Sequence, residues 1–181
     1  MEDLKVLANL IKQKNQIDNQ ISQLIGRPAL ICHVGEYIAS KVFDIRLKKS
    51  AAQKAIDGVF QSGQLVGKSV NIKWYAKQEM ILDITPEALP DYYLILTGPV
   101  AQPVSSYGTT RPWIIVYIYL FDAVGLVDQL RQRNIKIGVA TSVAKQYWDA
   151  AEVYPEQSNK ELSLDEHARR QLAFFNSANR Y

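Results

Sequence analysis

Apolar residues in the first 25 positions recur at the spacing of a helix. They are separated by three, four or seven residues, and the pattern stops at Gly26 and Pro28. This spacing places apolar side chains on one face and predicts an amphipathic helix over residues 2–25. We therefore expect a packing helix in residues 1–26, buried on the domain or in a homodimer, and a main domain in residues 27–181. The stripe comprises Leu4, Leu7, Leu10, Ile11, Ile17, Ile21, Leu24 and Ile25.

A second helical pattern covers residues 34–47. Val34, Ile38, Val42 and Ile45 fall on one stripe of this segment. Glu36 lies in the first turn, at the margin of the apolar face, where a carboxylate is half solvated.

Strand patterns dominate the middle of the chain. Residues 55–60 predict a short strand that ends at a Ser-Gly turn, and residues 64–66 continue the hairpin. Residues 70–74 alternate between apolar and polar side chains, as a half-buried strand does. The continuous apolar runs 92–96 and 113–121 are typical of central strands that are covered on both faces.

The remaining segments complete an α/β pattern. A long loop rich in Gly, Pro, Ser and Thr occupies residues 98–112, and a short helix over 122–133 precedes a strand over 135–139. A C-terminal helix over 163–176 would begin with Ser163 as its N-cap. We predict an α/β domain with a mixed central sheet of about four to five strands flanked by helices.

Composition narrows the class of protein. One cysteine and two histidines among 181 residues exclude an internal disulfide framework and a multi-histidine metal site. The longest apolar run has nine residues, too few to span a bilayer as a helix, so we expect no membrane partner and a cytoplasmic location. The net charge of +3 slightly favours an acidic partner such as nucleic acid.

Four polar residues form the candidate chemical site. Glu36 lies on a predicted helix, Asp57 lies in a predicted strand, and Asn71 and Lys73 share one face of the next strand. Adjacent strands are about 4.8 Å apart, so the hairpin can bring Asp57 beside Asn71 and Lys73. Grouped oxygen ligands suit Mg²⁺, and a lysine beside the metal can orient water or stabilise charge on a phosphate.

This order of residues resembles the PD-(D/E)XK nuclease superfamily, which has the restriction-endonuclease-like fold. That family is typified by a helix glutamate, a strand aspartate and an acid-x-lysine on the following strand, and Gly35-Glu36, Ile56-Asp57-Gly58 and Asn71-Ile72-Lys73 match in that order. The resemblance implies hydrolysis of DNA phosphodiester bonds with Mg²⁺ or Mn²⁺, in restriction or defence. It implies Asp57, Asn71 and Glu36 as metal ligands, with Lys73, Glu36 and Asp57 as catalytic residues.

The sequence departs from the family pattern at one position. Asn71 stands where the family usually has Glu or Asp, and offers a neutral carbonyl oxygen in place of a charge. With Asp57 as the sole strand carboxylate, metal affinity is expected to fall unless Glu36 or a substrate phosphate supplies the missing charge. Two alternatives follow: a catalytically impaired module that binds DNA or a protein, and a homodimeric assembly protein built on the N-terminal helix.

Basic residues near the site favour DNA as the partner. One group precedes the first strand and could contact backbone phosphates, although lysines at the end of a helix also favour its dipole without any ligand. Another arginine lies in the long loop, where the alternative is anchoring of the loop itself. The candidate nucleic-acid-binding residues are Arg46, Lys48, Lys49, Lys54 and Arg111.

Overall fold

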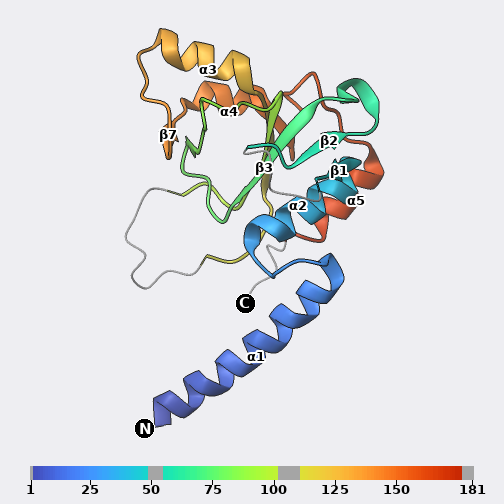
Figure 1. The fold of residues 1–181 in the computed structure, drawn as a ribbon, viewed down its shortest axis with the longest axis vertical. Helices are drawn as coiled ribbons and strands as arrows, with labels where there is room; N and C mark the ends of the chain where they lie inside the picture. The colour runs from blue at the N-terminus through green and yellow to red at the C-terminus, as the bar shows by residue number, and fades with distance from the viewer. Residues whose placement is uncertain (1, 49–54, 102–110, 177–181) are drawn as a thin grey trace.

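The computed structural model describes residues 2–48, 55–101 and 111–176. It shows an α/β protein whose mixed, open sheet is flanked by helices (Figure 1). The prediction of an α/β fold with a mixed sheet is confirmed, and the sheet has six strands instead of four to five.

The order of strands in the sheet is β1-β2-β3-β5-β6-β8. Strands β3 and β5 are parallel, and the other neighbours are antiparallel. A second sheet contains two short strands, β4 and β7. The strands are β1 (Ile45–Leu47), β2 (Gly58–Phe60), β3 (Ser69–Tyr75), β4 (Ile81–Leu82), β5 (Tyr92–Thr97), β6 (Tyr117–Asp122), β7 (Thr141–Ser142) and β8 (Glu152–Tyr154).

Side chains along β3 alternate between the two faces of the sheet, and each face packs against a separate hydrophobic core. Val70, Ile72 and Trp74 face the core formed with α2 (Ile31–Val42) and α5 (Glu166–Ala173), as the sequence predicts. Odd positions point to the opposite face, where the core includes α3 (Ala123–Gln132) and α4 (Lys145–Ala151). Asn71 and Lys73 therefore lie on the α3 side of the sheet.

The second helix is shorter than its apolar pattern predicts. It ends at Val42, and Asp44 adopts a positive φ of 50° that turns the chain into β1. Ile45 fits the helical stripe, yet it packs into the same core from a strand, with 4% of its surface exposed. The helix also begins earlier than predicted, at Ile31, so Glu36 lies in its middle and not in its first turn. Arg46 lies on an edge strand, not at a helix end.

Three segments differ from the predicted strands because their backbone N–H groups form hydrogen bonds outside the sheet. The strand expected over 113–121 begins only at Tyr117, since the Ile115 N–H donates to the Phe175 carbonyl of the C-terminal segment. The strand expected over 135–139 is absent, because the Ile135 N–H closes α3 by donating to Leu130. The segment 64–66 forms a 3-10 turn over Gly63–Leu65 in place of a strand.

The N-terminal helix α1 (Glu2–Ile25) projects from the body of the protein (Figure 1). Its bounds match the prediction, but none of its residues is buried, and only its C-terminal end approaches the body. The apolar stripe is therefore not covered by the domain itself. No helix in the described part of the chain combines the length and apolar character needed to cross a membrane.

The C-terminal helix α5 begins with a different cap from the expected one. The Asp165 carboxylate accepts a hydrogen bond from the Ala168 N–H at 2.7 Å, and Ser163 lies outside the helix. Because α5 places Leu172 in the core with none of its surface exposed, its first turn matters to the whole domain.

We expect Asp165→Ala to lower the free energy of unfolding by about 1 kcal/mol, because the Ala168 N–H would lose its acceptor. Ser163→Ala is the matched control and should change stability by less than about 0.5 kcal/mol. Denaturant unfolding of both variants checks this. Equal losses in the two variants would contradict the assignment of Asp165 as the cap.

Candidate functional site

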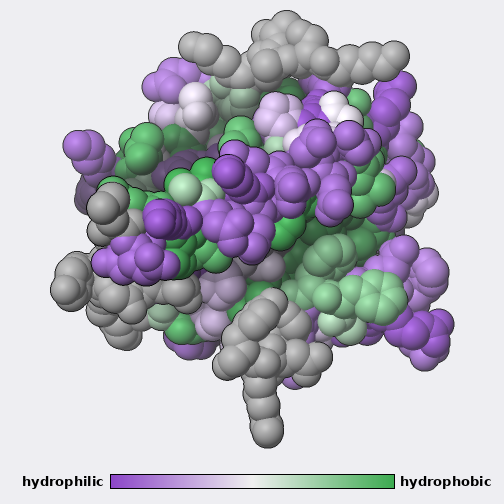
Figure 2. All heavy atoms as spheres, turned by 90° about the horizontal axis from the view of Figure 1, so that it is seen from below, coloured by the Kyte–Doolittle hydropathy of each residue, from purple (hydrophilic) through white to green (hydrophobic). Residues whose placement is uncertain are grey.

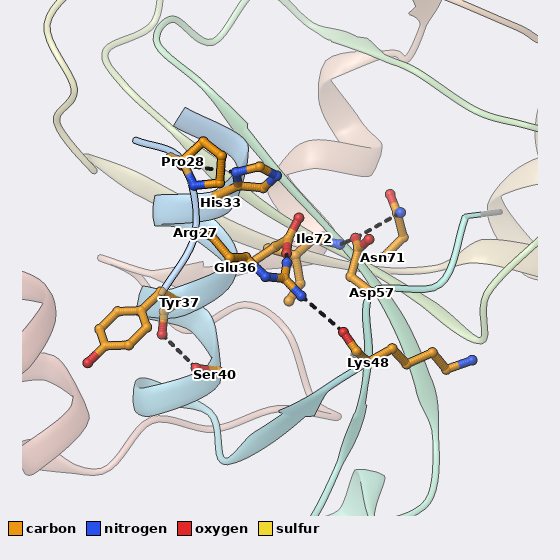
Figure 3. A network of polar contacts seen from close by, with 10 residues as sticks. All are labelled: Arg27, Pro28, His33, Glu36, Tyr37, Ser40, Lys48, Asp57, Asn71 and Ile72. Atoms are coloured by element: carbon orange, nitrogen blue, oxygen red, sulfur yellow. Dashed lines mark hydrogen bonds and ion pairs between the residues drawn. The ribbon is translucent and has the colours of Figure 1, made fainter. Parts of the chain in front are cut away.

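The site forms where β2 stops short of β3. Strand β2 pairs with β3 only as far as Val70, so the Ile72 N–H faces no β2 residue. Asp57, just before β2, fills this position with its side chain: its Oδ2 accepts from the Ile72 N–H at 2.7 Å and from Asn71 Nδ2 at 2.9 Å (Figure 3). The Asp57 carboxylate is therefore held by a backbone group and a side chain of the same strand.

Asn71 has an acceptor without a partner among the described residues. Its side chain is buried, and while Nδ2 donates to Asp57, Oδ1 accepts no hydrogen bond from residues 2–48, 55–101 or 111–176. A buried oxygen without a donor costs about 1–3 kcal/mol. A hydrogen-bond donor beside this oxygen would therefore stabilise the protein.

Lys73 lies on the same face as Asn71, two residues along β3. Its Nζ is 6.0 Å from the centre of the Tyr93 ring. Burial lowers the pKa of Lys73, and the carboxylates of Asp83 and Asp57 oppose that effect. Asp83 is itself fixed, because its Oδ1 accepts from the Ala140 N–H at 2.7 Å. The ammonium is thus partly desolvated and near two negative groups.

Glu36 reaches the site from α2, on the opposite side of the sheet. Its carboxylate pairs with Arg27 Nη1, and Arg27 Nη2 donates to the Lys48 carbonyl at 3.0 Å (Figure 3). Only 12% of the Glu36 side chain is exposed. Burial and then the charge of Asp57 raise the pKa of Glu36, while Arg27 and His33 lower it. The two carboxylates are therefore close enough to repel each other.

Burial also raises the pKa of Asp57, against the opposing effects of the Ile72 N–H, Lys73 and Arg27. The site thus contains two partly desolvated carboxylates whose pKa values are raised and a lysine whose pKa is lowered. Such a combination is more typical of functional sites than of ion pairs on a protein surface. Such a pair gains free energy by binding a proton or a metal cation.

The structure places Asn71 in contact with Asp57, and it places Glu36 and Lys73 close enough to interact with the charge of Asp57 from opposite sides of the sheet. The predicted basic residues are more scattered. Arg46 is exposed on β1, beside β2 in the sheet. The Lys48 N–H donates to the Asp57 carbonyl at 2.8 Å, so Lys48 is next to the site.

The other basic residues of the predicted group are placed as follows. Lys49 and Lys54 lie outside the described residues. Arg111 is exposed and precedes Trp113, whose ring centre is 6.1 Å from that of Trp74.

Two residues of the site are not evident from the sequence pattern. Arg27 sits in the turn between the first two helices, nine positions before Glu36, so neither helical nor strand spacing joins it to the site. Asp83 meets Lys73 only through folding of the segment between β3 and β5. The sequence contains one local indication of this role: Arg27 is a charged residue between the helix breakers Gly26 and Pro28.

Comparison of the sequence with protein-family models and with curated proteins finds no match. Within residues 2–48, 55–101 and 111–176, no group of three or more His, Cys, Asp or Glu side chains is arranged to hold a metal ion. The site instead combines two carboxylates with the amide oxygen of Asn71.

We expect Arg27→Gln to lower the free energy of unfolding by about 1–3 kcal/mol at pH 7, because Glu36 would lose its charged partner. The pKa of Glu36 is already raised by burial, and losing Arg27 would raise it further. When folding raises the pKa of a carboxyl group, the folded protein is destabilised at pH values where the unfolded chain carries the group as a carboxylate. The loss should therefore shrink below about pH 4, where the group is protonated in both states.

Denaturant unfolding at both pH values measures this difference, and the matched control is the double variant Arg27→Gln/Glu36→Gln. It removes the charge that Arg27 neutralises and should regain most of the stability at pH 7. An equal loss at both pH values would show that Arg27 acts through the Lys48 carbonyl or through packing alone.

Proposed function

We propose that the protein is a Mg²⁺-dependent deoxyribonuclease of the PD-(D/E)XK type, acting in restriction or defence. The observation that carries the proposal is the contact of Asp57 with Asn71, with Lys73 following on the same face of β3. Glu36 adds a carboxylate from the preceding helix. The chain has the residues of the family pattern in the same order. An acidic residue on a helix is followed by an acidic residue at the start of a strand, and the next strand carries Asn71-Ile72-Lys73. Together with the mixed sheet, these contacts support a restriction-endonuclease-like fold.

The donor set suits a hard divalent cation. Asp57 and Glu36 supply anionic oxygens, and Asn71 would supply a neutral one by turning its Oδ1 toward Asp57, in place of the Nδ2 that donates there. Mg²⁺ takes one or two carboxylates in proteins and keeps several waters, so these three side chains would hold it. When bound, the cation supplies Lewis acidity and lowers the pKa of coordinated water. Mn²⁺ has similar preferences for oxygen ligands.

Lys73 is the group that acts on the substrate. Hydrolysis adds water to phosphorus, breaks one phosphorus–oxygen ester bond, and gives a proton to the leaving oxygen. Negative charge grows on the phosphoryl oxygens as the new bond forms, and an ammonium in a low-dielectric site stabilises it more than one in water does. Burial lowers the pKa of Lys73, and the carboxylates of Asp83 and Asp57 oppose that effect, which favours the ammonium form.

DNA would approach along the edge of the sheet that carries β1. Arg46 is exposed on that strand, and Lys48 follows it next to Asp57. Contacts from Arg and Lys to phosphates position a duplex without reading its sequence. The proposed phosphate-binding group also includes Lys49, Lys54 and Arg111.

A second candidate function is a DNA-binding or protein-interaction module that has lost metal chemistry. Asn71 favours it, because its amide already donates to Asp57 and the site has one carboxylate fewer than the family pattern. The two candidates differ in their response to metal and in the need for Lys73.

The first test is cleavage. We expect the protein to nick or linearise plasmid DNA in the presence of Mg²⁺ or Mn²⁺ and to lose this activity in EDTA. Lys73→Met and Asp57→Asn should each lower the rate by about 100-fold or more, because each removes a group that stabilises developing charge. Gel analysis of the DNA over time measures this.

The matched control is Lys68→Met, which removes an exposed lysine paired with Asp91 just before β3. It should keep the wild-type rate. If wild-type protein binds the plasmid but does not cleave it with either metal, the proposed nuclease function is wrong and the DNA-binding function is supported. Cleavage that survives Lys73→Met would show that the activity does not come from this site.

The second test is metal binding by Asn71→Asp. A further anionic oxygen beside Asp57 should strengthen cation binding, and repulsion between the carboxylates should destabilise the metal-free protein. We expect a larger rise in melting temperature with Mg²⁺ or Mn²⁺ than in wild type, by several degrees. Asp57→Ala should remove the rise in both backgrounds. An Asn71→Asp variant without any metal response would show that these residues do not form a metal site.

A further inference from the structure

The apolar stripe of α1 is exposed along the length of the helix. Its leucines and isoleucines keep about half or more of their surface exposed from Leu4 to Ile17, and Leu24 is 72% exposed. Figure 2, which views the molecule from below Figure 1, shows hydrophobic surface among hydrophilic residues on that face. An isolated helix gains little stability from its own hydrogen bonds, so such a stripe is normally covered.

The stripe has the spacing of a coiled-coil seam. Positions a and d of successive heptads are occupied by apolar side chains, with one lysine among the a positions. Ile11 and Ile25 flank the seam at e positions. The seam residues are Leu7, Lys14 and Ile21 at a, and Leu10, Ile17 and Leu24 at d.

We propose that α1 pairs with α1 of a second copy of this chain in an antiparallel coiled coil. In this arrangement each a residue faces a d residue of the other helix. Leu7 faces Leu24, Leu10 faces Ile21, and Lys14 faces Ile17, and every pair occurs twice because the arrangement has two-fold symmetry. The seam is therefore complementary to itself.

Charge selects the antiparallel direction. A parallel pair would place Lys14 directly opposite Lys14 of the second copy, with two like charges in one layer. In the antiparallel pair, Lys14 faces an isoleucine, and Asp18 of the second copy is one position away. Lys14 already pairs with Asp18 within its own helix, so the centre of the seam holds two positive and two negative charges.

The surface at the base of α1 is continuous with this seam. Ile21, Leu24 and Ile25 line an apolar groove of about 460 Å³, together with side chains of α2 and the rings of Trp113 and Phe174. The antiparallel register brings the N-terminal end of the second α1 to this groove, with Leu4 of the second copy near Ile25. The same occupant thus covers both the stripe and the groove, independently of the chemistry at Asp57.

The first experiment measures mass and uses a charge placed inside the seam. Light scattering of the full chain should give twice the 20.5 kDa of one chain. Leu10→Lys should give a monomer with an unchanged circular dichroism spectrum of the body, and Gln16→Lys, which adds the same charge outside the seam, should remain a dimer. A monomeric wild type, or loss of the dimer in both variants, overturns the proposal.

The second experiment tests direction by disulfide cross-linking. In a Cys32→Ser background, which removes the exposed native cysteine, Leu7→Cys and Leu24→Cys are prepared separately. The antiparallel register predicts a cross-linked dimer only when the two variants are unfolded together, refolded together and oxidised. Cross-linking of each variant alone would show a parallel pair, and absence of cross-linking in the mixture would show that α1 does not pair in this register.

Discussion

The site depends on the difference in length between β2 and β3. Strand β2 begins at Gly58, whereas β3 continues to Tyr75, so part of β3 has no strand beside it on that side within the described residues. Asp57 supplies the missing acceptor from its side chain, and this hydrogen bond to the Ile72 N–H holds a carboxylate beside β3. The Ile72 N–H at this edge of the sheet therefore has a hydrogen-bond acceptor, and the same edge carries a negative charge. Asn71 donates to that carboxylate, and Glu36 and Lys73 interact with its charge.

Two cationic side chains lie near the carboxylates of Glu36 and Asp57. Two carboxylates, Glu36 and Asp57, are accompanied by Arg27 on the α2 side and by Lys73 on the α3 side. Asn71 contributes no charge and donates to Asp57, which lowers the repulsion that a third carboxylate would cause. In the proposed metal site, the neutral amide of Asn71 would attract a cation less than a carboxylate does, and the proposed nuclease would work with two acids.

Elements with an uninterrupted period could be predicted from the sequence, and contacts between distant segments could not. Residues 2–25 and 70–74 have clear helical and strand periods, and alternation correctly placed Asn71 and Lys73 on one face. Ile45 fitted a helical stripe by spacing alone, although Asp44 turns the chain before it. The hairpin made the approach of Asp57 to Asn71 predictable. The pairing of Arg27 with Glu36 depends on the turn after α1, for which periodicity carries no signal.

A crystal structure with Mn²⁺ tests the central claim most directly, because the anomalous signal of manganese locates the ion without reference to activity. The account predicts an anomalous peak in contact with the Asp57 carboxylate and near Glu36. It also predicts that the Asn71 amide turns its oxygen toward the ion and gives up its hydrogen bond to Asp57. Crystals that bind Mn²⁺ elsewhere or not at all, with Asn71 still donating to Asp57, would contradict the assignment of these residues as a metal site.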